Sequence, residues 1–145
     1  MQRITNRIIP MFEGYCRKND IDGKEIVASI SGNKVTLKVA ANDNTKAKGL
    51  MGSNEPGDMD GMIFVYETPQ ILDFWMKNVE YELDILFFDE NLKLVDHFTM
   101  DAYQGESEDK LKIYKSKSPA MYAVELKSGW YNDNIKSEDN IKLKI

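Results

Sequence analysis

The sequence has little that supports covalent cross-links, metal binding or nucleophilic catalysis. Its 145 residues include one cysteine, Cys16, and one histidine, His97. A single cysteine cannot form an intramolecular disulfide, and no CxxC or Cys/His spacing indicates zinc. A serine or cysteine nucleophile would have to use His97 as its base, but His97 follows Asp96 in a predicted strand and is expected to be exposed. We therefore expect no metal site and no catalytic triad.

Long apolar runs, basic clusters and glycine-rich phosphate loops are also absent. No window approaches 18 consecutive apolar residues, and the N-terminal residues do not resemble a secretory signal, so no membrane span is expected. The net charge of −5 argues against a nucleic-acid partner, because phosphate binding needs clustered cations. Neither GxGxxG nor GxxxxGK occurs, and no cofactor is expected. The chain as written is expected to be soluble and cytoplasmic, or exported if a leader was removed.

The composition that remains is typical of one globular domain. Hydrophobic residues make up 42% and charged residues 30% of the chain, which is long enough to bury a sizeable core. Residues 1–23 end in a turn-rich string and predict an N-terminal arm, and residues 24–145 predict a single β-rich domain. Within the arm, a short amphipathic helix could form from Arg3, Ile4, Ile8, Met11 and Phe12.

Short β-forming runs separated by turn residues continue from residue 25 to the end. Two hairpins are predicted, at residues 25–30 with 34–40 and at residues 83–88 with 92–100. Further strands are predicted at 62–66, 72–76, 113–115, 121–127 and 141–145, with short helical turns from Thr45 and near 128–131 and an acidic loop at 101–110. This spacing predicts a mainly β fold, a sandwich or jelly-roll-like barrel with two or three short helical turns.

Five motifs occur in one order between residue 35 and residue 145. They are GLMG at 49–52, GMIFVY at 61–66, FWMKN at 74–78, LDILFFD at 83–89, and YAVEL at 122–126 followed by Gly129 and Trp130. This order resembles the prokaryotic family known as domain of unknown function 192. The resemblance implies a compact, jelly-roll-like β domain of unassigned role, commonly behind a secretion or lipoprotein-type leader that this sequence does not show. The family often has an arginine near the GLM motif, where this chain has Lys46 and Lys48.

The FWMKN motif combines an indole, a thioether, an ammonium and an amide. On a regular strand, Trp75 and Lys77 would face one side and Met76 and Asn78 the other, so only one pair can be buried. If Trp75 and Lys77 are open, they form an aromatic platform beside a cation, suited to an anionic or carbohydrate-like ligand. If Trp75 is buried, as most indoles are, Lys77 extends to solvent or pairs with a carboxylate.

Two carboxylates, Asp84 and Glu125, lie within apolar predicted strands. A buried carboxylate needs a hydrogen-bond donor or a cation, and Lys77 is the expected partner of Asp84, Glu125 or Asp73. If both carboxylates converge on Lys77, the site could perform acid/base chemistry or bind a cation, although a structural ion-pair network would use the same residues.

The leading hypothesis is a non-enzymatic module that binds a small ligand or a protein. Its expected binding residues are Met51, Trp75, Lys77, Asn78 and Trp130. The alternative is a small hydrolase- or lyase-like enzyme with Lys77, Asp84 and Glu125 as candidate catalytic residues. In a third interpretation the motif cluster is entirely core, and the working surface lies in the loops.

Overall fold

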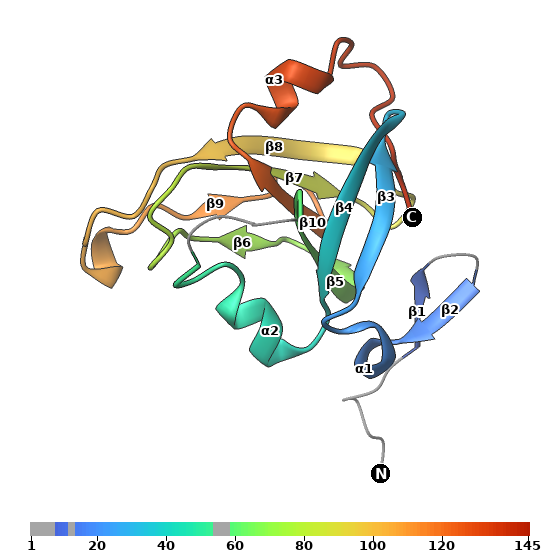
Figure 1. Cartoon of the computed structure of the whole chain (residues 1–145), viewed down its shortest axis with the longest axis horizontal. Coiled ribbons are helices and arrows are strands. Elements are labelled where there is room, and N and C mark those ends of the chain that lie inside the picture. The colour runs from blue at the N-terminus through green and yellow to red at the C-terminus, as the bar shows by residue number, and fades with distance from the viewer. Residues whose placement is uncertain (1–7, 12–13, 54–58) are drawn as a thin grey trace.

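A curled seven-stranded sheet dominates the computed structural model, which describes residues 8–11, 14–53 and 59–145, with side chains from residue 20 on. The strand order is β11-β3-β4-β5-β10-β7-β8, and neighbours are antiparallel except for the parallel pair β4 and β5. The strands are β3 (Glu25–Ile30), β4 (Asn33–Ala40), β5 (Gly61–Gln70), β7 (Leu83–Phe88), β8 (Leu94–Met100), β10 (Ala120–Lys127) and β11 (Leu143–Lys144). The sheet curls towards a half-barrel, so the mainly β fold class is confirmed (Figure 1).

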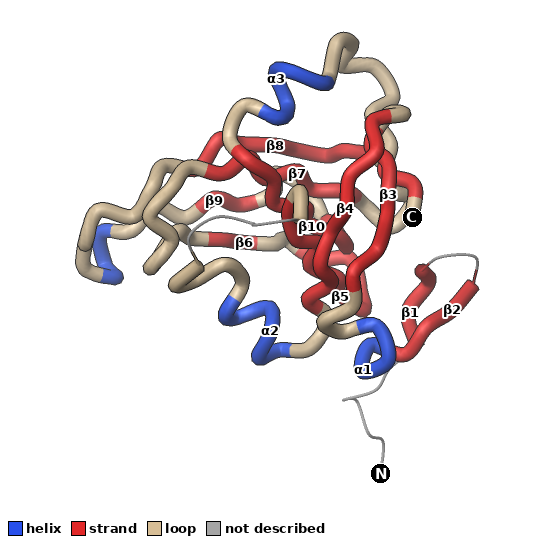
Figure 2. Tube along the Cα trace, in the orientation of Figure 1, coloured by secondary structure: helices blue, strands red, loops and turns tan. Residues whose placement is uncertain are grey.

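Short elements surround this sheet. Two ribbons pair β1 (Ile8–Met11) with β2 (Gly14–Arg17) and β6 (Asp73–Phe74) with β9 (Tyr114–Lys115). The helices are α1 (Lys18–Ile21), α2 (Asp43–Lys48), α3 (Trp130–Asn134) and the 3₁₀ helix η1 (Glu108–Lys110), and Figure 2 shows how little of the trace they occupy. In the part of the chain that the structure describes, no helix has the length and apolar character needed to span a membrane.

The core consists of two hydrophobic clusters, one on each face of the sheet. One cluster includes Leu86 and Val124 and extends to α3 through Tyr131, and the other includes Ile85 and Ala123. All six residues of β7 are buried because this strand has a cluster on each side. The near-continuous apolar runs of β7 and β10 therefore follow from burial on both faces.

Most predicted elements are confirmed, including both hairpins and the short helix near Thr45. The predicted strand at 72–76 is wrong beyond Phe74, because β6 is only two residues long. Trp75 and Met76 are not part of a strand, and Lys77 and Asn78 form a turn in which Asn78 has a φ of 60°. The backbone therefore leaves the strand conformation just before Trp75.

The predicted helix in the N-terminal arm is also wrong where the structure describes it. Residues 8–11 form β1 instead, which suits the β-branched pair Ile8 and Ile9. Pro10 lacks the backbone N–H that a helix interior needs. Arg3, Ile4 and Phe12, which belonged to the same predicted helix, lie outside the described residues.

Candidate functional site

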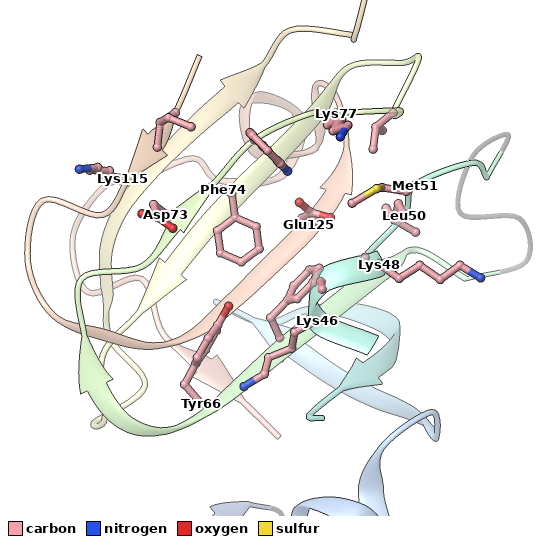
Figure 3. A pocket seen from close by; sticks show the side chains of 16 residues that line it. Lys46, Lys48, Leu50, Met51, Tyr66, Asp73, Phe74, Lys77, Lys115 and Glu125 are labelled. Carbon is pink, nitrogen blue, oxygen red and sulfur yellow. The ribbon is translucent and has the colours of Figure 1, made fainter. Parts of the chain in front are cut away.

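A cavity of about 550 Å³ opens on the face of the sheet that carries α2 and the β6–β9 ribbon (Figure 3). Its walls come from α2 and the turn after it, from β5 and β10, and from the chain around β6 and β9. Most of the lining side chains are aromatic, ionisable or contain a thioether. They include Lys46, Met51, Phe64, Tyr66, Asp73, Phe74, Trp75, Lys77, Lys115 and Glu125. The volume lies within the range of small-molecule sites.

Glu125 supplies a buried acid to this cavity. It lies in the middle of β10, opposite Met62 of β5 and Ile85 of β7, and is 5% exposed. Its carboxyl group faces the cavity beside the ring of Phe74 (Figure 3) and accepts no hydrogen bond from any residue that the structure describes. Burial raises the pKa of Glu125 to about 8, because the low-dielectric surroundings disfavour the charged form. At pH 7 the side chain is therefore mainly a neutral carboxylic acid.

The close approach of β5 to β10 depends on Gly61. A Cβ atom added there would lie 1.8 Å from the backbone oxygen of Glu125. The φ of Gly61 is outside the left-handed region, so any residue could adopt this backbone conformation. Glycine is needed here because there is no space for a Cβ atom. The glycine that begins the GMIFVY motif therefore sets the position of the strand segment that carries the buried acid.

Aromatic side chains form the apolar part of the cavity. The rings of Phe64 and Phe74 meet edge to face, with 4.9 Å between their centroids and an interplanar angle of 78°. Phe74 also contacts Phe87 in the core beneath, at a centroid distance of 5.8 Å. Trp75 is half-buried and completes this lining. Edge-to-face contacts of this kind fix ring orientation, so the wall presents a defined apolar surface to a ligand.

Two lysines lie against aromatic rings at the cavity. Lys46 Nζ lies 4.0 Å from the ring centroid of Tyr66 and donates a hydrogen bond to the Val65 carbonyl at 3.2 Å. Lys77 Nζ lies 5.7 Å from the ring centroid of Trp75. Burial raises the pKa of Tyr66, and the nearby carboxyl groups, Glu125 first, raise it further. Tyr66 is therefore a neutral hydrogen-bonding group in the cavity.

The ion-pair partner of Lys77 was predicted incorrectly. It pairs with Glu108, at the start of η1 in the acidic loop, and not with Asp73, Asp84 or Glu125. Both side chains are partly exposed, at 32% for Lys77 and 59% for Glu108. An exposed pair of this kind contributes little to stability, and it places the Glu108 carboxylate of the acidic loop next to Lys77 at the edge of the cavity.

Four of the expected residues, Met51, Trp75, Lys77 and Glu125, line the same cavity. Neither Asn78 nor Trp130 lines it. Asn78 is exposed, its carbonyl accepts a hydrogen bond from Gly52 N, and its amide nitrogen lies 4.0 Å from the sulfur of Met51. Asn78 therefore supports the turn after α2. Trp130 begins α3 and packs against the cluster on the other face of the sheet.

Asp84 does not converge with Glu125 and Lys77. The register pairs Leu126 with Asp84 and Glu125 with Ile85, which places the two carboxyl groups on opposite faces of the sheet. Asp84 is 2% exposed and accepts hydrogen bonds from Thr99 Oγ1 at 2.8 Å and from the backbone N–H of Tyr131 at 2.9 Å. It joins β7, β8 and α3, which is a structural role.

His97 was expected to be exposed and is half-buried. Its ring stacks on Tyr131, with 3.8 Å between the centroids and an angle of 11° between the planes. Like Asp84, it lies on the side of α3, because its register partner on β7 is Leu86.

The exchange of Asp84 for asparagine is expected to destabilise the protein. Asp84→Asn keeps the side-chain shape but has only one oxygen for the two donors, Thr99 Oγ1 and Tyr131 N–H. One buried donor then loses its acceptor, so we expect a loss of roughly 1–3 kcal/mol in the free energy of unfolding. Urea unfolding measures it, with Glu25→Gln, an exposed carboxyl-to-amide exchange on β3, as the control. Equal stability of the two variants would contradict the structural role of Asp84.

Lys46, Tyr66, Phe64 and Phe74 were not among the residues expected from the sequence. Tyr66 ends the GMIFVY motif, and this polar-tipped aromatic after an apolar run was a usable signal. For Lys46 the signal was indirect: it lies near the GLM motif, where the resemblance implies an arginine, but its place in the cavity depends on how α2 packs against β5.

The comparisons with known proteins agree on the family and the fold. Residues 26–143 match the model of the family DUF192, described as an uncharacterized ACR. Among curated proteins, none matches the chain. A protein of unknown function from Novosphingobium aromaticivorans is similar in structure, with a TM-score of 0.68, 23% identity and coverage of 83% of this chain and 85% of that one.

A second similar structure is a "putative transcription regulator" from Sinorhizobium meliloti. Its TM-score is 0.72 at 23% identity, with coverage of 86% of this chain and 95% of that one. At this identity the two structures show a shared fold and not a shared activity. The family match extends over most of the chain, from β3 into β11, and the protein therefore belongs to the uncharacterised family DUF192.

Proposed function

We propose that this protein binds a small organic molecule in the cavity beside α2 and does so without catalysing a reaction. The observation that carries the proposal is Glu125, a 5% exposed acid that faces the cavity and accepts no hydrogen bond from the described residues. Polar groups with so little exposure are nearly always paired, so an unpaired one that faces a cavity is a candidate to bind a ligand. A ligand with a complementary polar group would satisfy Glu125 while its apolar part contacts the aromatic wall.

The enzymatic alternative has less support. It needs Asp84 and Glu125 together with Lys77, but the sheet separates the two carboxyl groups and Lys77 pairs with Glu108. A pKa of about 8 would suit Glu125 to proton transfer, but a catalytic site also needs a second group positioned against the same substrate. The described residues offer Glu125 only one ionisable neighbour with a shifted pKa, Tyr66.

The two tryptophans provide a matched test of the cavity. Trp75 lines it, whereas Trp130 lies on the opposite face of the sheet, and both are half-buried. In a thermal-shift screen of small organic molecules, compounds that stabilise the wild type should bind Trp75→Ala about tenfold more weakly, since a wall of aromatic contact is lost. The same compounds should stabilise Trp130→Ala as they do the wild type.

Circular dichroism and amide NMR spectra establish that both variants are folded before binding is compared. Compounds that bind Trp75→Ala with unchanged affinity would place the binding site elsewhere. A screen in which no compound shifts the amide signals of residues around the cavity would overturn the proposed function itself.

A further inference from the structure

The charge of the cavity lining is the first clue to the class of ligand. Its ionisable side chains come from α2, from β5, β6, β9 and β10, and from the turn after β6, and they are Lys46, Lys48, Tyr66, Asp73, Lys77, Lys115 and Glu125. Four lysines thus stand against two carboxyl groups, one of which is the mainly neutral Glu125. Lys77 is paired to Glu108 and Lys46 has interactions of its own, but lysines still outnumber carboxyl groups in the cavity lining, which gives it a positive field. Such a field attracts anions and repels cations.

The aromatic rings give a second, independent clue. A cationic ligand would use the ring faces of Tyr66 and Trp75, but a lysine of the chain already lies over one face of each ring. Lys46 Nζ lies 4.0 Å from the Tyr66 centroid, and Lys77 Nζ lies 5.7 Å from the Trp75 centroid. A second cation at either ring would meet like-charge repulsion, which offsets the cation–π attraction. Ring edges and the Phe64–Phe74 wall remain for an apolar, uncharged part of the ligand.

Glu125 gives the third clue. A neutral carboxyl group has an O–H donor as well as acceptor oxygens, whereas a carboxylate can only accept. Because the side chain is buried, faces the cavity and has no donor from the described residues to hold it as an anion, its O–H is available to a ligand acceptor. A hydrogen bond from a neutral donor to an anionic oxygen is stronger than one between two neutral groups.

We propose that the cavity selects organic anions with an apolar ring, and that protonated Glu125 donates the hydrogen bond that holds their anionic group. This inference rests on the proposed binding function and adds the ligand class and the protonation state. The lysines draw the anion towards the cavity, the phenylalanine wall contacts its ring, and Glu125 binds its oxygen. No bond is broken and no proton leaves Glu125.

Three probes of one shape and different charge test the ligand class. They are 2-naphthoate, 2-naphthylmethanol and 2-naphthylmethylamine, titrated into the full chain at pH 6.5 by calorimetry, with amide NMR to locate each site. The naphthoate should bind at least tenfold more tightly than the alcohol, and the ammonium compound should bind most weakly. Equal or tighter binding of the alcohol or the amine at the cavity would overturn the inference while leaving the binding function intact. If no probe reaches the cavity at millimolar concentration, the inference is overturned, whereas the binding function is overturned only if the wider screen also finds no compound for the cavity.

The pH dependence tests the role of Glu125. With a pKa of about 8, its protonated fraction falls about tenfold from pH 7 to pH 9, so the affinity for 2-naphthoate should fall by the same factor. Glu125→Gln retains an N–H donor of similar shape and has no proton to lose. It should bind naphthoate at pH 9 within threefold of its affinity at pH 7. Glu125→Ala, which has no donor, should bind it at least tenfold more weakly than the wild type at pH 7.

The control is Glu25→Gln, which should keep the wild-type pH profile because Glu25 lies exposed on β3, outside the cavity lining. A loss of naphthoate binding in Glu125→Gln at pH 7 would show that a neutral hydrogen-bond donor at this position does not hold the anion, and would overturn the inference. A fall in affinity with pH that persists in Glu125→Gln would assign the titration to another group and overturn it as well.

Discussion

Glu125→Gln is expected to be more stable than the wild type above pH 8 and equal to it near pH 4. The ordinary pKa of a glutamate, 4.5, applies in the unfolded chain, and burial raises the folded value to about 8. Below pH 4.5 the side chain is protonated in both states and resembles glutamine. Between pH 4.5 and pH 8 the folded state binds more protons than the unfolded state, so wild-type stability falls as pH rises.

The difference in the free energy of unfolding between Glu125→Gln and the wild type is complete by about pH 8 to 9. We expect it to reach roughly 3–5 kcal/mol, with the variant more stable. Urea unfolding of both proteins at pH 4, 6, 7 and 9 measures the difference at each pH, and groups unaffected by the substitution cancel. Glu25→Gln, which changes an exposed glutamate, should follow the wild type throughout. A difference that is constant from pH 4 to pH 9 would show that Glu125 titrates normally and would contradict its burial in a neutral form.

Gly61→Ala is expected to be the most disruptive small substitution in the sheet. The new methyl group would lie 1.8 Å from the Glu125 backbone oxygen and 3.1 Å from a side-chain carbon of Leu126. Backbone atoms of a central strand are held by hydrogen bonds and close packing on both sides, so they cannot move away without a large loss of stability. The methyl group would therefore force β5 and β10 apart. We expect a loss of roughly 3–5 kcal/mol in the free energy of unfolding, or failure to fold.

Gly32→Ala is the matched control, since a Cβ there meets nothing within 4 Å and only the φ of +84° opposes the change. That backbone strain costs about 1–2 kcal/mol. Differential scanning calorimetry of the two variants separates steric from conformational effects. If Gly61→Ala is no less stable than Gly32→Ala, the close approach of the two strands at Gly61 is wrong.

Local sequence signals were sufficient for the elements that depend on local chemistry. The Ser31-Gly32 turn, both at positive φ, joins two alternating runs, and the hairpin forms where predicted. The Asp89–Asn91 turn works in the same way, because the Asp89 carboxylate accepts hydrogen bonds from the backbone N–H groups of Asn91 and Lys93. In both cases the turn residues and the flanking pattern agree.

In the segment around Trp75, the local sequence pattern was not sufficient to predict the path of the backbone. On a regular strand over residues 72–76, Trp75 and Met76 would face opposite sides of the sheet. The chain leaves β6 after Phe74, so Met76 enters the core while Trp75 stays half-buried at the cavity. Tertiary packing of Leu72, Met76 and Val79 determines this path, and no local pattern encodes it.

The two strand carboxylates show the same limit within the site. Asp84 and Glu125 both lie in apolar runs, and the sequence alone treats them alike. The register of β10 against β7 decides that Glu125 faces the cavity and Asp84 faces α3. A shift of β10 by one residue would turn Glu125 to the face that carries Asp84, so their different roles come from long-range pairing.

The titration of the Glu125 side chain tests the account most directly. The chemical shift of its carboxyl carbon, followed by NMR from pH 4 to pH 10 in the free protein and with 2-naphthoate present, reports protonation and binding at one atom. We predict a midpoint near pH 8 in the free protein, in line with its burial, and a higher midpoint with the probe. A midpoint near the ordinary value of 4.5 that the probe does not move would contradict the account.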